Sequence, residues 1–67
     1  MNIIRNRRTD LGLSQAELAR RVGVSSAHIC RIESGKRAPS VPMARKLAAA
    51  LDVSPVAIMR DVMATAA

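Results

Sequence analysis

The stretch that most constrains the fold is residues 15–33, QAELARRVGVSSAHICRIE. Its first eight residues carry apolar side chains at helical spacing, which predicts a short helix. Gly23 then stands where a positive φ costs least, so it predicts the end of that helix. A second short helix follows Ser25, with Ile29 and Ile32 pointing back toward the first helix. The stretch therefore predicts two short helices joined by a turn of three or four residues, and the rest of the chain must support this unit.

Serine residues mark where the other helices begin. Ser14 and Glu17 have the spacing of a capping box, in which each side chain satisfies the backbone amide of the other residue. Ser25 is placed to cap the next helix, and Ser40 and Ser54 are each followed by a proline in the first helical turn. These signals predict an all-α fold in which residues 1–67 form one domain of five helices, at about residues 2–11, 14–22, 25–34, 40–51 and 55–63. Residues 64–67 are expected to fray.

The core must be built from aliphatic side chains, because the chain has no Phe, Tyr or Trp. Such a core suits short, closely packed helices. Ile4, Arg8 and Leu11 share helical spacing and mark one face of the first helix, and Leu13 is expected to enter the core. The fourth helix carries the clearest apolar stripe, formed by Met43, Ala44, Leu47, Ala48 and Leu51.

The net charge of +6 is unevenly distributed along the chain. Residues 1–37 hold eight Lys and Arg against three acidic residues, whereas residues 38–67 hold three against two. A basic half beside a nearly neutral half favours a polyanion such as nucleic acid as a partner of one face. An ordinary solvated basic surface is the alternative.

Several functional classes find no support in the sequence. We identify no paired carboxylates, no nucleophile with a base and no metal-ligand spacing, so we expect no catalytic site, no metal site and no cofactor. The single cysteine, Cys30, cannot form an internal disulfide and fits a reducing cytoplasm; it is expected to face outward or to be partly covered. No apolar run approaches the roughly 18 residues of a membrane span, so no membrane association is expected.

Three segments carry a resemblance to a known family. The residues LGLSQAELARRVGVS, then I-x-x-I-E-S-G-K-R, then LAAALDVSP resemble the lambda-repressor-like Cro/C1-type (XRE) helix-turn-helix family over nearly the whole chain. Ala19, Gly23, Ile29 and Ile32 stand at the spacings where that family has a small residue, a glycine and two core aliphatic residues. The resemblance implies five helices around one core, with the second helix crossing the backbone of double-stranded DNA and the third in its major groove.

The family also often has a buried Arg–Glu pair between its first and third helices. The matching residues here are Arg8 and Glu33, and the alternative is that both side chains are solvated. Removing one partner of a buried pair leaves an unpaired charge at a cost of roughly 3–5 kcal/mol.

The N-terminal side chains of the third helix are the candidates for base recognition, because a helix in the major groove presents that end to base edges. They are Ser26, Ala27, His28 and Arg31. Arg31 is the strongest candidate, since a guanidinium matches the O6 and N7 acceptors of guanine. The alternative for Arg31 is a phosphate contact or no contact with DNA, and His28 is as readily an idle surface residue.

Phosphate contacts are expected from Gln15, Ser25, Lys36 and Arg37. Gln15 lies at the predicted start of the second helix, where backbone amides favour anions, and the matching glutamine in the family reaches the DNA. Its alternative role is simply to start the helix.

The fifth helix is the candidate dimer interface, through Val56, Met59, Val62 and Met63. The alternative is that these residues complete the core. The function predicted is that of a transcriptional regulator, a repressor, which binds a near-palindromic operator sequence-specifically as a homodimer. The alternative is an antitoxin-type or accessory module whose main partner is another protein, such as a toxin.

Overall fold

A computed structural model describes residues 2–65, and the side chains of residues 3–63. Within these residues the chain forms five α-helices and no strand, which confirms the all-α fold. The helices are α1 (Asn2–Asp10), α2 (Gln15–Val22), α3 (Ser26–Glu33), α4 (Val41–Leu51) and α5 (Pro55–Thr65).

Serine hydroxyls cap three of these helices in the way that the sequence predicts. The amide of Glu17 donates to the Ser14 hydroxyl at 3.0 Å, and the amide of Ser14 donates to the Glu17 carboxylate at 3.2 Å, which completes the capping box. The Ser25 hydroxyl accepts from the amide of His28 and caps α3, and the Ser40 hydroxyl accepts from the amide of Met43 and caps α4, in both cases without a capping box. The end of α5 differs from the prediction, since the helix continues two residues past 63 to Thr65; residues 66–67, also expected to fray, lie outside the described part.

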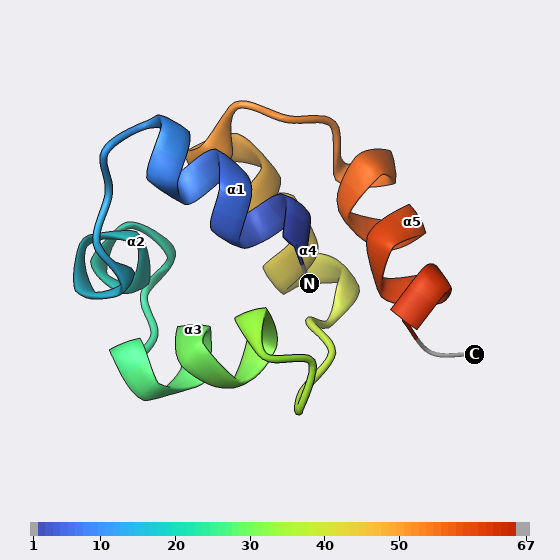
Figure 1. The fold of residues 1–67 in the computed structure, drawn as a ribbon, viewed down its shortest axis with the longest axis horizontal. Coiled ribbons are helices and arrows are strands. Elements are labelled where there is room, and N and C mark those ends of the chain that lie inside the picture. The colour runs from blue at the N-terminus through green and yellow to red at the C-terminus, as the bar shows by residue number, and fades with distance from the viewer. Residues whose placement is uncertain (1, 66–67) are drawn as a thin grey trace.

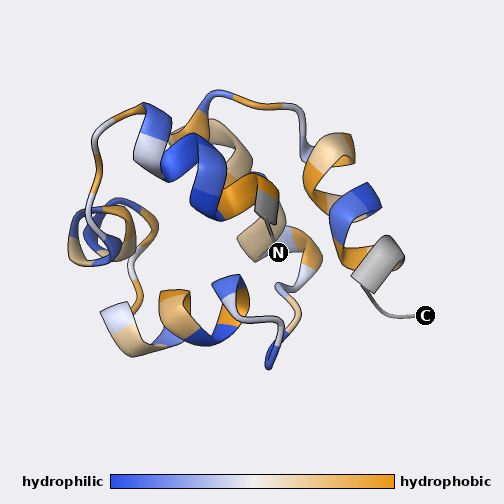
Figure 2. Ribbon diagram, in the orientation of Figure 1, coloured by the Kyte–Doolittle hydropathy of each residue, from blue (hydrophilic) through white to orange (hydrophobic). Residues whose placement is uncertain are grey.

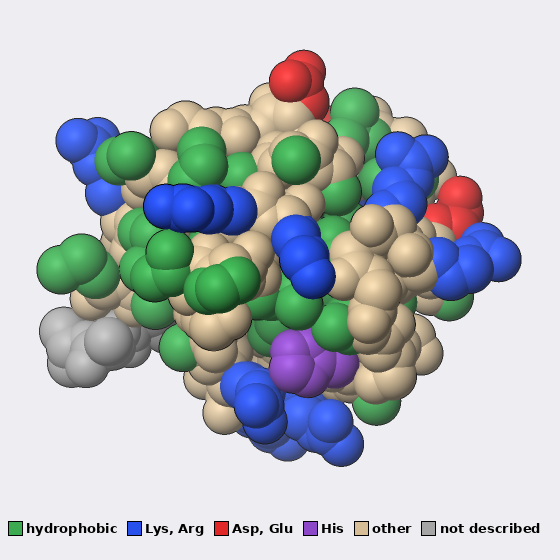
Figure 3. Space-filling model, turned by 180° about the vertical axis from the view of Figure 1, so that it is seen from behind, with side chains coloured by type: hydrophobic (Ala, Val, Ile, Leu, Met, Phe, Trp, Pro, Cys, Tyr) green, Lys and Arg blue, Asp and Glu red, His purple; other side chains and the backbone are tan. Residues whose placement is uncertain are grey.

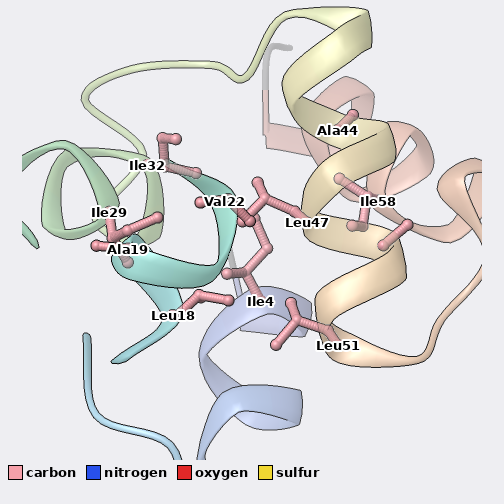
Figure 4. Close-up of a cluster of buried hydrophobic side chains, with 11 residues drawn as sticks. Ile4, Leu18, Ala19, Val22, Ile29, Ile32, Ala44, Leu47, Leu51 and Ile58 are labelled. Carbon is pink, nitrogen blue, oxygen red and sulfur yellow. The ribbon is translucent and has the colours of Figure 1, made fainter. Parts of the chain in front are cut away.

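The helices surround a single core (Figure 1). In this view α1 and α4 overlap in the upper middle, α2 lies at the left, α3 runs along the bottom and α5 lies at the right. The Nε of Arg7 donates to the carbonyl oxygen of Leu51 at 3.2 Å, so α1 is tied to the last residue of α4. The apolar side chains of all five helices converge between them (Figure 4). They are Ile4, Leu18, Ala19, Val22, Ile29, Ile32, Ala44, Leu47, Ala48, Leu51 and Ile58.

The first helix departs from the predicted pattern at its C-terminal end. Ile4 is fully buried, but Leu11 is 43% exposed, although the two residues share helical spacing. The helix ends at Asp10, so Leu11 lies in the following turn and its side chain leaves the inner face. Leu13 enters the core in its place and is 8% exposed.

Helices α2 and α4 both end at a residue with a positive φ, but the residue is different in each case. Gly23 ends α2 with a φ of 78°, as its lack of a side chain allows. Asp52 ends α4 with a φ of 55°, a left-handed conformation that the sequence pattern did not predict at a residue other than glycine. Aspartate is among the residues that tolerate this conformation best.

Hydrophilic and hydrophobic residues are unevenly distributed over the helices (Figure 2). Hydrophilic residues concentrate in α1 and in the loop after α3, whereas α4 and α5 carry more hydrophobic ones. None of the described helices combines the length and the apolar character that crossing a membrane requires.

Candidate nucleic-acid interface

Helix α3 has one buried side and one exposed side. Ile29 and Ile32 are fully buried and Glu33 is 2% exposed, so these three residues define the inner side. Opposite them, Ala27 and Arg31 lie one turn apart and both are exposed. Small and basic side chains on an exposed helix are what the major groove of a duplex can accept, so this side is the candidate surface for DNA.

The predicted base-contact residues do not all share this side. Ser26, Ala27 and Arg31 are exposed as expected, but His28 is half-buried and lies at its edge. The sequence predicted that Cys30 either faces outward or is partly covered. In the structure Cys30 is exposed, at the opposite edge of this side. Of the four predicted side chains, only Ala27 and Arg31 therefore share the exposed side, whereas Ser26 and His28 lie toward its two edges.

Helix α2 holds α3 in place through the turn that joins them. The amides of Gly23 and Val24 both donate to the carbonyl oxygen of Ala19, the latter at 2.9 Å. The amide of His28 then donates to the hydroxyl of Ser25 at 3.2 Å, which starts α3 at a defined residue. With a residue as small as Ala19 facing it, α3 packs closely against α2, and its orientation is fixed by the turn as well as by the core.

The basic loop after α3 folds back onto the end of that helix. The amides of Lys36 and Arg37 donate to the carbonyl oxygen of Arg31 at 3.0 and 3.2 Å, and the hydroxyl of Ser34 donates to the same oxygen at 3.1 Å. Both side chains in the loop are exposed. The loop therefore keeps two cations next to the exposed side of α3, where the DNA backbone would run.

A network of charged and polar side chains joins α1, α2 and α3. We call it the polar junction and define it as Arg5, Arg8, Gln15 and Glu33. The Arg8 guanidinium donates to both oxygens of Glu33, through Nε at 2.7 Å and Nη2 at 3.1 Å. Its Nη1 donates to the carbonyl oxygen of Leu13 at 2.8 Å. The structure thus brings together the Arg–Glu pair that the family resemblance implied, with the Glu33 side chain fully buried.

Two further members of the polar junction were not predicted. The Nε2 of Gln15 donates to Oε1 of Glu33 at 3.1 Å, and the Nε of Arg5 lies 3.6 Å from the same oxygen. From the sequence, Gln15 was predicted only to contact a phosphate or to start the second helix. The signal that could have revealed its second role is the buried acid itself, because a carboxylate with one arginine partner has room for further donors.

The surroundings of Glu33 favour its charged form. Burial alone would raise the pKa of this carboxyl, but hydrogen bonds from Arg8 and Gln15 and the positive charges of Arg8 and Arg5 hold the pKa below its ordinary value. The same hydrogen bond to Glu33 raises the pKa of Arg8. The polar junction is therefore a charged, hydrogen-bonded connection between three helices at ordinary pH.

A shallow groove of about 310 Å³ lies between α4 and α5 on another part of the surface. We call it the α4–α5 groove; it is lined by Val41, Ala44, Arg45, Pro55, Val56, Met59, Arg60 and Met63. Hydrophobic side chains are exposed on this side of the molecule, with Lys and Arg side chains among them (Figure 3). Val41, Val56 and Met63 are 54%, 59% and 73% exposed, an unusual position for large apolar side chains.

The predicted interface residues on α5 divide into two kinds. Val56 and Met63 are exposed, whereas Met59 and Val62 are half-buried and pack against the core. Met59 and Val62 therefore help to complete the core, whereas a dimer contact through the exposed Val56 and Met63 stays a prediction. Val41 was missed because it begins α4, and only the folded chain places it next to α5.

Comparisons with known proteins agree with this geometry. A family profile described as helix-turn-helix matches residues 4–58. An uncharacterized HTH-type transcriptional regulator of Methanothermobacter thermautotrophicus is 47% identical over 49 residues, which cover 73% of this chain and 71% of that protein. No solved structure matches the chain. The five helices, the capped turn between α2 and α3 and these matches show that the chain belongs to the Cro/C1-type (XRE) helix-turn-helix family.

Proposed function

We propose that this DNA-binding transcriptional regulator acts as a repressor that recognises a near-palindromic operator as a homodimer. The observation that carries the proposal is the exposed side of α3, where Ala27 and Arg31 face outward beside the basic loop. The name of the Methanothermobacter relative, an HTH-type transcriptional regulator, supports the regulation of transcription.

In this proposal α3 enters the major groove and its side chains divide the work of recognition. Arg31 reads guanine through O6 and N7, Ala27 offers its methyl group to a thymine methyl, and Ser26 accepts several bases. His28, at the edge of the exposed side, contacts a base or a neighbouring phosphate. Lys36 and Arg37 contact phosphates from the loop, while Ser25 and Gln15 contact them from the starts of α3 and α2.

A single α3 covers too few base pairs to select one operator in a genome, so two subunits are expected. Their α3 helices would lie about 34 Å apart, one turn of the duplex, on the two half-sites of the operator. The dimer contact is proposed through Val56, Met59, Val62 and Met63 of α5. If each subunit neutralises about four phosphates, the logarithm of the affinity should fall with the logarithm of the salt concentration at a slope of roughly −7.

The decisive experiment is selection of binding sites from random duplexes with the wild-type chain and the Arg31→Ala variant. The variant should lose preference at one base pair in each half-site, at a cost of roughly 1–3 kcal/mol. Lys36→Ala is the control, because it removes the same charge without removing a base contact; it should weaken all sequences alike and flatten the salt dependence. An unchanged site preference in Arg31→Ala would place base recognition elsewhere.

The second candidate function is that of a protein-interaction module, and the exposed apolar side chains of the α4–α5 groove favour it. In that case a protein such as a toxin would cover the groove and the chain would not bind DNA by itself. A gel shift with competitor duplex separates the two candidates. Specific retention of a duplex by the purified chain supports the regulator, and no retention at low ionic strength supports the module.

A further inference from the structure

Gln15 occupies a position between the inside of the protein and the proposed DNA surface. Its side chain is half-buried, and its Nε2 donates to the buried Oε1 of Glu33 at 3.1 Å. Glu33 is held in turn by two hydrogen bonds from Arg8. The side chain of Gln15 is therefore anchored from inside, unlike a surface glutamine that changes rotamer freely.

The anchor also determines which end of the amide group faces inward. A carboxylate only accepts hydrogen bonds, so the NH2 group of Gln15, and not its carbonyl oxygen, must point at Glu33. One N–H of that group serves Glu33, and the second N–H on the same nitrogen remains for an acceptor beside the helix. A neutral or absent side chain at position 33 would leave the orientation of the amide undetermined.

The start of α2 is the place where an anionic acceptor would be held. The amide of Glu17 donates to the Ser14 hydroxyl, and the helix offers no partner to the amides of Gln15 and Ala16. An acceptor seated there could receive these backbone amides and the second N–H of Gln15 together. A phosphate of the duplex has the required negative charge and the several acceptor oxygens.

We propose that Glu33 is a positioning residue for DNA binding, which orients the Gln15 amide so that one nitrogen bridges the buried carboxylate and a backbone phosphate. The inference rests on the proposed function, since it needs Gln15 to lie against DNA. The polar junction then has a second role, because the same carboxylate that joins three helices also aims a phosphate donor. Arg8 supports this role through Glu33 and does not itself contact the phosphate.

The test is a double-mutant cycle on affinity for a short duplex at low ionic strength, measured by fluorescence anisotropy at a temperature where every variant is folded. Gln15→Met keeps the length of the side chain and removes both N–H groups, so affinity should fall about tenfold. Glu33→Gln should weaken binding by a similar factor in the wild-type background. In the Gln15→Met background it should have almost no further effect, because the group that it orients is gone. Equal effects of Glu33→Gln in both backgrounds would mean a purely structural role and would overturn the proposal.

A second variant covers the case in which Glu33→Gln does not fold. Gln15→Asn keeps the amide group but is one methylene shorter, so it cannot reach Glu33 and a phosphate at once. It should lose as much affinity as Gln15→Met with an unchanged salt slope, because no charge is removed. Wild-type affinity in Gln15→Asn would overturn the bridging geometry.

Nuclear magnetic resonance supplies a readout that is independent of affinity. In the free protein, the two side-chain protons of Gln15 should differ widely in chemical shift, because only one faces a carboxylate. Addition of duplex should shift the second proton, and an unmoved second proton in a chain that binds DNA would rule out the bridge. If the wild-type chain itself binds no duplex, the proposed function fails along with the inference. If the wild-type chain binds and Gln15→Met binds equally well, the inference fails but the proposed function stands.

Discussion

The polar junction and the α4–α5 groove show two ways in which one small chain joins its helices. At the polar junction, a fully buried carboxylate binds Arg8 and Gln15, so charges and hydrogen bonds set the angle between α1, α2 and α3. In the groove, α4 and α5 meet through aliphatic side chains, and Val56 and Met63 remain largely exposed. The polar groups of the polar junction find hydrogen-bond partners within the chain, whereas the α4–α5 groove leaves apolar surface exposed.

The difference follows from what each junction must do. Hydrogen bonds to a buried charge are directional, and misalignment is costly, so the polar junction suits the proposed role of α3, in which the helix meets DNA at one angle. Apolar contact is not directional and scales with the area removed from water. The α4–α5 groove can therefore gain further stabilisation from a second copy of the chain, which agrees with the proposed homodimer.

Breaking the polar junction should have the largest effect. Arg8→Met removes one partner and leaves Glu33 buried without its main counter-charge, so the free energy of unfolding should fall by roughly 3–5 kcal/mol. Urea denaturation followed by circular dichroism measures the change. The double variant Arg8→Met, Glu33→Met should recover much of the loss, because no charge is then left unpaired.

A matched control separates this effect from the loss of any arginine. Arg21→Met removes an exposed arginine from α2 that lies outside both the polar junction and the α4–α5 groove, and it should alter stability by less than about 0.5 kcal/mol. If Arg8→Met were no worse than Arg21→Met, the polar junction would contribute no more than an exposed surface pair, and the polar junction would no longer differ in this way from the α4–α5 groove.

Adding a charge to the α4–α5 groove should have the next largest effect, on association instead of folding. Val56→Asp places a carboxylate where a second copy would cover an apolar side chain, so the dimer should weaken by about 2 kcal/mol, or about thirtyfold in Kd. Sedimentation equilibrium measures the shift toward monomer. Leu11→Asp is the control, since Leu11 is also an exposed large apolar residue but lies outside the groove. Equal dissociation in both variants, or none in either, would move the interface away from α5.

Acid should weaken the polar junction and leave the groove unchanged. The pKa of Glu33 is lowered in the folded state from an ordinary value of 4.5, so near and below that pH the unfolded chain binds more protons at this carboxyl. Stability from Glu33 is therefore complete above pH 4.5 and is lost as the pH falls through the folded-state pKa, with a slope of at most about 1.4 kcal/mol per pH unit. Thermal unfolding at stepped pH measures it, and the Arg8→Met, Glu33→Met variant should lack this component. The same acid dependence in that variant would assign the effect to other carboxylates.

The smallest effect is expected at the turn between α2 and α3. Gly23→Ala meets no atom within 4 Å, so its cost is the left-handed backbone alone, about 1 kcal/mol. Calorimetry detects a change of this size. Asp52→Gly alters the corresponding turn between α4 and α5 and should shift stability less, because relief of strain is offset by greater freedom of the unfolded chain. A larger change in stability for Asp52→Gly would show that the turn between α4 and α5 is more strained than the turn between α2 and α3.

Local patterns in the sequence were enough to predict the helices and their starts. Ser14 with Glu17, and later Ser25 and Ser40, act on amides three residues away, so their capping contacts need no knowledge of the fold. Leu11 shows the limit of periodicity, because helical spacing cannot say that the helix ends one residue earlier. The left-handed Asp52 was missed for a related reason, since aspartate allows this conformation without requiring it.

Contacts between distant residues depended on the tertiary structure. The sequence determined where the helices form and which side of each is apolar, because capping and periodicity act over a few residues. Only packing decided that Gln15 binds Glu33, that Val41 joins α5 in a groove and that His28 lies at the edge of the exposed side of α3. The physical reason is that these positions depend on the angles between helices, which the shared core sets together with the polar junction between α1, α2 and α3.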